Sequence, residues 1–308
     1  MRVSTSMMYQ QHSSNITQSN SNYNDRATRL ASQRSHLLPS DDPFAASQAV
    51  KTQHELARNE QYASARDNAI GALGLEDNAL SDIFDAIQTA KTKIVQAGDG
   101  ALSNEDRASL ALELESLRER LYSLGNTRDS AGNYIFAGTK TDAPPFVKNN
   151  GVITYQGSDA AISQKVGESR DMAVGHIGSE VFSSGGHDIF ASLDNAITAL
   201  RTPVNTDDER EALRQVLDGA NITMKAMINQ GGRIQSEVGT NLRELDMLES
   251  SGAKQQIDLT DKFQKYVGSD SDSLVTMIGQ SKMAEVAVQI SMSTFQTMQS
   301  LSLFNLIR

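Results

Sequence analysis

The sequence contains no cysteine and no tryptophan. Without cysteine, the chain forms no disulfide, no cysteine-based zinc site and no thiol nucleophile. Aromatic residues make up 5% of its 308 residues, which is little material for a large globular core. Because prolines are also rare while Ala, Leu, Gln and Ser are frequent, the composition favours long helices instead.

An excess of positive charge and a long apolar run are both missing. The formal net charge is −10 and the isoelectric point is about 5.0, whereas nucleic acids and anionic membranes recruit basic patches. The most apolar stretch, 274–290, is interrupted by Gln280, Lys282 and Glu285, and a membrane span needs about 20 largely apolar residues. Arg2 is followed by no apolar run typical of a secretory signal. We therefore expect no nucleic-acid partner, no membrane insertion and no cleaved signal.

Groups that bind metals or catalyse reactions do not form a recognisable pattern. The histidines are scattered, at His12, His36, His54, His176 and His187, and none has metal-ligand spacing. Asp41 and Asp42 suit either acid–base chemistry or a helix start, and the following Pro43 favours the helix start. The Asp270–Asp272 segment lacks the central glycine and distal glutamate of a calcium loop. The sequence thus predicts a non-enzymatic protein without catalytic residues, cofactors or metal.

Apolar residues follow heptad spacing in three segments, which predicts three long amphipathic helices. Ser103–Asp106 and Thr206–Glu209 have the form of capping boxes and predict where the second and third helices begin. The third stripe is long enough for a helix of more than forty residues. The stripes are Leu73, Leu80, Ile83, Ile87, Ala90, Ile94 and Ala97; Leu110, Leu114, Leu117, Leu121 and Leu124; and Leu213, Leu217, Ala220, Met224, Met227, Gly231, Ile234, Val238, Leu242, Leu245 and Leu248.

Between the second and third stripes the pattern changes. From Gly132 to about Gly186, β-branched and aromatic residues alternate with turn residues. Strands are predicted at 134–136, 152–155 and 162–166, and Asn150-Gly151 predicts a tight hairpin. Residues 187–201 predict a short amphipathic helix before Pro203. The segment is therefore predicted to be a β-rich insert.

The two ends need partners. Residues 1–24 carry seven sizeable apolar side chains. Burying them contributes roughly 14 kcal/mol, less than the roughly 36 kcal/mol that ordering the segment costs. We expect this arm to be disordered in a free monomer. The C-terminal stretch is apolar on two faces and requires more than one neighbour, and residues 268–273 predict a break before it. One face carries Met283, Val286, Ile290, Leu301 and Phe304, and the other Ala284, Val288, Phe295 and Met298.

These patterns predict a mainly α fold with a small β-rich insert, built as an elongated antiparallel helical rod. Terminal coiled-coil arms are predicted at 1–40 and 265–308, the helical rod at 41–131 and 203–264, and the β insert at 132–202. Both arms are expected to form an assembly interface. Its predicted residues are Val3, Met7, Ile16, Tyr23, Leu30, Ala284, Val288, Phe295, Met298, Leu301 and Phe304.

Four motifs along the chain resemble the bacterial flagellin family. Residues 30–34 (Leu-Ala-Ser-Gln-Arg) and 39–47 (Pro-Ser-Asp-Asp-Pro-Phe-Ala-Ala-Ser) resemble its N-terminal signature, in the version carried by its hook–filament junction members. Residues 134–146 resemble the start of the family's β domain. Residues 155–157 and 301–304 resemble later pieces. Flagellin itself is less similar, because its signature usually lacks the prolines that flank the Asp-Asp pair.

The resemblance implies a structural adaptor, exported uncleaved through the flagellar type III pathway to the extracellular flagellum. It implies a ring of copies between hook and filament, with neighbouring hook-associated and flagellin subunits and a cytoplasmic chaperone on the C-terminal helix. The terminal helices would order on assembly. Alternatives are a filament-forming flagellin, a type III tip protein, and a secreted enzyme or adhesin that uses surface-loop aromatics Tyr155 and Phe182. The Pro-Ser-Asp-Asp-Pro motif argues against the tip protein.

Overall fold

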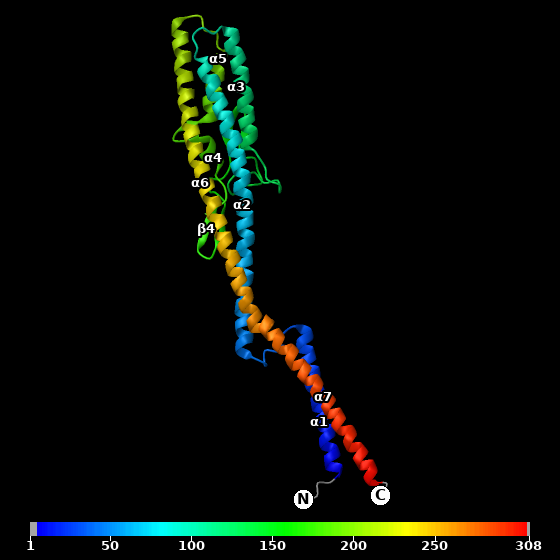
Figure 1. The fold of residues 1–308 in the computed structure, drawn as a ribbon. Coiled ribbons are helices and arrows are strands. Elements are labelled where there is room, and N and C mark those ends of the chain that lie inside the picture. The colour runs from blue at the N-terminus through cyan, green and yellow to red at the C-terminus, as the bar shows by residue number, and fades with distance from the viewer. Residues whose placement is uncertain (1–4, 307–308) are drawn as a thin grey trace. The chain divides into compact units, whose positions relative to one another are not determined.

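The computed structural model describes residues 5–306, with side chains described for residues 7–300 except Ser184. Long helices dominate it, and short antiparallel strands occur in the segment 146–188 (Figure 1). The mainly α fold with a small β-rich insert is thus confirmed. The helices are α1 (Thr5–Ser32), α2 (Pro43–Ala97), α3 (Asn104–Gly125), α4 (Gly178–Phe182), α5 (Ile189–Arg201), α6 (Asp207–Val267) and α7 (Ser271–Leu306).

The chain divides into two compact units. One consists of the residues up to Glu60 together with those from Gly252 onward, and the other is Gln61–Ser251. Both boundaries fall inside helices, α2 and α6. Each unit is described by itself below. The predicted division into arms, rod and insert remains a prediction.

The long helices begin where the capping residues predict. Asp42 accepts a hydrogen bond from the Ala45 amide at 2.9 Å, and Pro43 takes the first helical position of α2, where no amide hydrogen is needed. Ser103 and Asp106 form a reciprocal capping box at α3. At α6 the Glu209 amide donates to the Thr206 hydroxyl at 3.2 Å. The helix that follows has 61 residues, which confirms the prediction of more than forty.

The predicted stripes form the core of the Gln61–Ser251 unit, where α2, α3, α5 and α6 meet. Gly231 of α6 lies so close to Phe84 of α2 that any Cβ would overlap the ring. The missing side chain therefore permits close packing at this point. Fully buried members of the stripes include Leu73, Leu80, Ile83, Ile87, Leu114, Leu121, Met224, Met227, Val238 and Leu245.

The insert contains three two-stranded antiparallel sheets. In the first, the turn residues Asn150 (φ 51°) and Gly151 (φ 90°) are both left-handed, as a tight hairpin turn requires, which confirms the predicted hairpin. The strand pairs are β1 (Phe146–Asn149) with β2 (Val152–Tyr155), β3 (Ser163–Gly167) with β4 (Arg170–Ala173), and β5 (Ser183–Ser184) with β6 (His187–Asp188).

The strand predicted at 134–136 is wrong. Tyr134 forms only an isolated bridge to Arg128, and the chain then turns. Phe136 is fully buried, its carbonyl accepts from the Gly178 amide at 2.9 Å, and Gly138 adopts φ 61°. The backbone is therefore committed to loop contacts rather than to a sheet ladder. The apolar side chains that suggested a strand serve the core instead.

Aromatic side chains form the centre of the insert's core. The Phe146 ring lies 4.8 Å from Phe182 and 5.4 Å from both Tyr155 and Phe190 between centroids. Phe182 is 1% exposed, and the Tyr155 hydroxyl donates to the Ser158 carbonyl at 2.8 Å. The expectation that Tyr155 and Phe182 are surface-loop aromatics is therefore wrong, because both pack in this cluster. The adhesin alternative loses the ligand-binding residues it depended on.

Candidate assembly surface on the terminal helices

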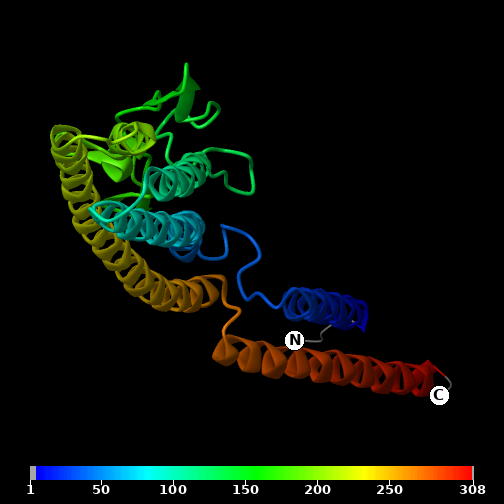
Figure 2. The ribbon, with the colours of Figure 1, turned by 90° about the horizontal axis from the view of Figure 1, so that it is seen from above.

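The terminal helices α1 and α7 lie side by side (Figures 1 and 2). Residue numbers rise along α1 as they fall along α7 in the contacts between them, so the pair is antiparallel. Three contacts mark its register. They are the Tyr9 and Phe295 rings at 5.3 Å, the Ser19 and Ser291 hydroxyls at 3.1 Å, and the Arg26 guanidinium donating to the Gln280 amide oxygen at 2.7 Å.

Half-buried side chains follow heptad spacing on both helices and define the α1–α7 seam. On α1, Ile16, Tyr23 and Leu30 are half-buried at intervals of seven residues. On α7 the half-buried apolar members include Ala284, Val288, Phe295 and Met298. These seven residues belong to the predicted assembly interface. The structure places them half-buried on two helices that pack against each other within one chain, and their role between chains remains a prediction.

The other predicted interface residues are placed differently. Met7 is 66% exposed and contributes little to the seam. Val3 lies outside the described residues. The backbone at Leu301 and Phe304 belongs to α7, but their side chains lie outside the description.

A second apolar face of α7 is open to solvent, and we call it the outer face. It includes Met283, Val286 and Ile290, of which Ile290 is 60% exposed, so the predicted two-faced character of this helix is confirmed. Exposed apolar side chains gathered on one element mark an interaction surface. The prediction missed three further exposed members, although the all-round apolar sequence of α7 signals them. These are Val275, Ile278 and Met292.

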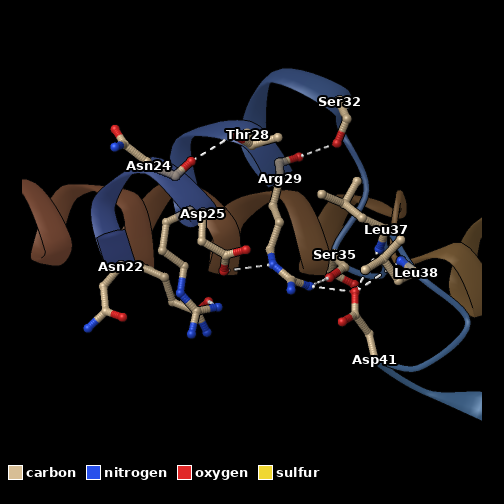
Figure 3. Close-up of polar contacts among 12 residues, drawn as sticks. Asn22, Asn24, Asp25, Thr28, Arg29, Ser32, Ser35, Leu37, Leu38 and Asp41 are labelled. Atoms are coloured by element: carbon tan, nitrogen blue, oxygen red, sulfur yellow. Dashed lines mark hydrogen bonds and ion pairs between the residues drawn. The ribbon is translucent and has the colours of Figure 1, made fainter. Parts of the chain in front are cut away.

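Arg29 and Asp41 tie the end of α1 to the loop that leads into α2 (Figure 3). Arg29 donates to the Asp25 carboxylate at 3.0 Å, to Asp41 at 3.1 Å and to the Ser35 carbonyl. Asp41 also accepts from the amides of Leu38 at 3.1 Å and Leu37 at 2.9 Å. The hydrogen bonds from these two backbone amides and from the Arg29 guanidinium lower the pKa of Asp41. Its carboxylate is therefore a structural anion, and the acid–base interpretation of Asp41–Asp42 has no support.

The predicted break between α6 and α7 is confirmed, and it contacts the same loop. The Ser35 amide donates to the Gly268 carbonyl at 3.1 Å. Gly268 has φ 64°, which favours glycine, and a Cβ there would overlap the Ser35 hydroxyl. Glycine is therefore required for two separate reasons. Asp270 accepts from the Ser273 hydroxyl at 2.7 Å at the start of α7, which makes it a capping residue.

The described part of the chain has neither a metal-binding cluster nor a membrane-spanning helix. Among residues 5–306, no cluster of three or more His, Asp or Glu side chains has the geometry to bind a metal ion. Within the same range, none of the helices combines the length and apolarity that membrane crossing requires.

Comparison with known proteins places the chain in a class. The family model described as the bacterial flagellin N-terminal helical region matches residues 3–141. Flagellin B of Helicobacter pylori is 27% identical over 126 residues, covering 41% of this chain and 23% of that one. These two matches relate the first half of the chain to flagellin-type proteins.

The match to one branch of that class spans the whole chain. Flagellar hook-associated protein 3 of Salmonella typhimurium is 39% identical over 100% of both chains. The protein of that name from Escherichia coli is 38% identical over 99% of both chains. This chain belongs to the flagellar hook-associated protein 3 family.

Solved structures share the fold. A putative flagellar hook-associated protein from Vibrio parahaemolyticus has a TM-score of 0.67 at 20% identity, covering 74% of this chain and 100% of that chain. FlgL of Xanthomonas campestris has a TM-score of 0.65 at 19% identity, covering 69% and 99%. At these identities, the likeness concerns the fold alone.

Proposed function

We propose that this chain is a structural subunit of the bacterial flagellum, located at the junction between hook and filament. The observation that carries the proposal is 39% identity over the full length of a flagellar hook-associated protein 3. The proposed role is that of an adaptor, which acts by providing contact surfaces to neighbouring subunits. No catalytic step is assigned to it.

Assembly is driven by burial of the outer face of α7. In a single chain, Val275, Met283 and Ile290 are 70%, 68% and 60% exposed. Full burial of such a side chain contributes about 1.5–3 kcal/mol, so a few of them supply a specific contact. The proposed partners are further copies of the chain in a ring, followed by neighbouring hook-associated and flagellin subunits.

Export and folding are part of the same proposal. The chain leaves the cytoplasm uncleaved through the flagellar type III pathway, with a chaperone covering α7 beforehand. A helix with an open apolar face is the kind of element that such a chaperone recognises. Residues 5–32 and 271–306 are helical in the structure, and their disorder in the free chain remains a prediction.

The second candidate is a filament-forming flagellin, which the partial match to flagellin B favours. Gold-labelled antibody against this protein distinguishes the two by electron microscopy of intact flagella. We expect label in one band between hook and filament. Label along the whole filament would overturn the junction assignment and favour flagellin.

Gly268→Ala tests whether the contact between the loop and the helix break matters for assembly. Alanine in the left-handed region costs about 1–2 kcal/mol, and its Cβ would overlap the Ser35 hydroxyl. We expect a roughly tenfold or larger loss of incorporation into flagella, measured in competition with wild-type protein. The matched control is Gly232→Ala on α6, an exposed helical glycine where a Cβ meets nothing within 4 Å. Equal incorporation of the two variants would contradict this role.

A further inference from the structure

The β3–β4 hairpin, in the Gln61–Ser251 unit, is fastened to helices on two sides. Its buried side chains Val166 and Met172 join the apolar core. Arg66 of α2 donates to the Val166 carbonyl at 3.2 Å. Arg170 forms a bidentate pair with Glu244 of α6, with distances of 2.6 and 2.7 Å. The hairpin buries few apolar side chains, and these polar contacts add to the stabilisation that their burial provides.

His176, three residues beyond β4, provides a third attachment that reaches both helices. Its amide donates to Glu76 Oε1 on α2 at 2.7 Å, and its ring Nδ1 lies 3.0 Å from the same oxygen. On the other side, ring Nε2 lies 3.6 Å from Glu237 Oε2 on α6. The imidazole thus bridges carboxylates from two helices. Its side chain is only 12% exposed.

The surroundings of this ring are mostly acidic. Glu76 is 3% exposed, and its Oε2 has no hydrogen-bond partner among the described side chains and backbone. Glu180 of α4 and Arg233 of α6 line the groove beside the ring. Asp67 of α2 and Asp129 line the cleft on its other side. Glu76 and Glu237 contact the His176 ring, and the other three carboxylates and the guanidinium line the same pockets as the ring. A buried carboxylate such as Glu76 is costly without a cation nearby.

We propose that His176 is a pH-sensitive fastener, whose protonated ring joins α2 and α6 through Glu76 and Glu237 and holds the β3–β4 hairpin against them. Loss of the ring's proton removes the charge from both contacts. The hairpin then opens more readily. Among the side-chain types at these attachments, only histidine has an ordinary pKa between about pH 5 and 8.

The direction of the pH dependence follows from the ring's environment. Burial disfavours the charged imidazole, but the hydrogen bond to Glu76 and the charges of Glu76 and Glu237 outweigh it, so the pKa of His176 is raised. A group whose pKa is raised by folding stabilises the closed state fully below its unfolded pKa of about 6.5. That stabilisation is lost as the pH rises through the raised value. Alkaline conditions therefore favour opening.

Proton NMR of the imidazoles in the full chain tests the proposal directly. We expect the His176 ring to titrate with a midpoint above about 6.5. Glu237→Gln should lower that midpoint without unfolding the chain, because Glu237 is 63% exposed. A midpoint at or below the ordinary histidine value in the wild-type protein would overturn the proposal.

Hydrogen exchange of residues 163–178 tests the consequence, comparing wild type with His176→Gln at about pH 6 and about pH 8.5. Because the closed state binds the ring's proton more tightly than the open state does, opening becomes more favourable at the higher pH. We expect this extra opening in wild type and not in His176→Gln. The control is His187→Gln, since His187 contacts the Thr223 hydroxyl at 3.2 Å. The same pH dependence in wild type and His176→Gln would refute the proposal that the protonated His176 ring holds the β3–β4 hairpin closed.

Discussion

Ile290→Asp is expected to reduce incorporation into flagella by at least about 100-fold while the isolated chain keeps its fold. Ile290 is 60% exposed on the outer face of α7, so an aspartate there stays hydrated in a single chain. Burying that carboxylate without a partner in a contact between subunits costs several kcal/mol. Each 1.4 kcal/mol is a factor of about ten in affinity. Incorporation is measured in cells that express equal amounts of wild-type and variant protein.

The matched control is Ile222→Asp, which makes the same change at an isoleucine that is also 60% exposed, but on α6 in the Gln61–Ser251 unit. We expect it to be incorporated normally. Hydrogen exchange on the free variants checks that the 61–251 unit stays protected, and fast exchange at both ends would support ordering on assembly. If Ile290→Asp enters flagella as well as wild type does, the outer face is not the assembly surface.

Phe146→Ala should lower the free energy of unfolding of the Gln61–Ser251 unit by about 3–5 kcal/mol. Phe146 is 2% exposed, and its ring contacts Phe182, Phe190 and Tyr155. Truncation removes these contacts and leaves a cavity that the surrounding strands and helices fill only in part. Urea unfolding monitored by circular dichroism measures the change.

Val152→Ala is the control for Phe146→Ala, because Val152 is 56% exposed on β2, in the hairpin that contains Phe146. We expect it to change the free energy of unfolding by less than about 0.5 kcal/mol. Similar effects of the two substitutions would show that the aromatic cluster contributes no more than an exposed position.

The long helices were predictable because heptads and capping boxes are local signals. Ser103 and Thr206 mark helix starts because their hydroxyls accept hydrogen bonds from the backbone amides three residues further on. The strands were harder to predict, because pairing decides them. β4, with the sequence Arg-Asp-Met-Ala, has no β-branched residue and buries only Met172. The opposite error occurred at 134–136, where strand-like side chains serve the core of a loop.

The candidate assembly surface was predictable in part. Apolar spacing divides α7 into two faces and places Val288 and Phe295 on the half-buried one. The partner register is not encoded locally, since it depends on contacts such as Ser19 with Ser291 across 272 residues of sequence. The unit boundaries at Glu60–Gln61 and Ser251–Gly252 lie within uninterrupted helices. No break in the helix marks either of them.

The hydrogen bond between the Ser19 and Ser291 hydroxyls marks the register of the α1–α7 seam. A slip of one heptad would move one helix along the other by about 10 Å. Ser19 would then face Ala284 or Met298, seven residues from Ser291, and lose its hydrogen bond. This hydrogen bond therefore favours the observed register over one shifted by a heptad. In the proposed assembly, a common register would place the exposed apolar side chains of neighbouring molecules at the same level.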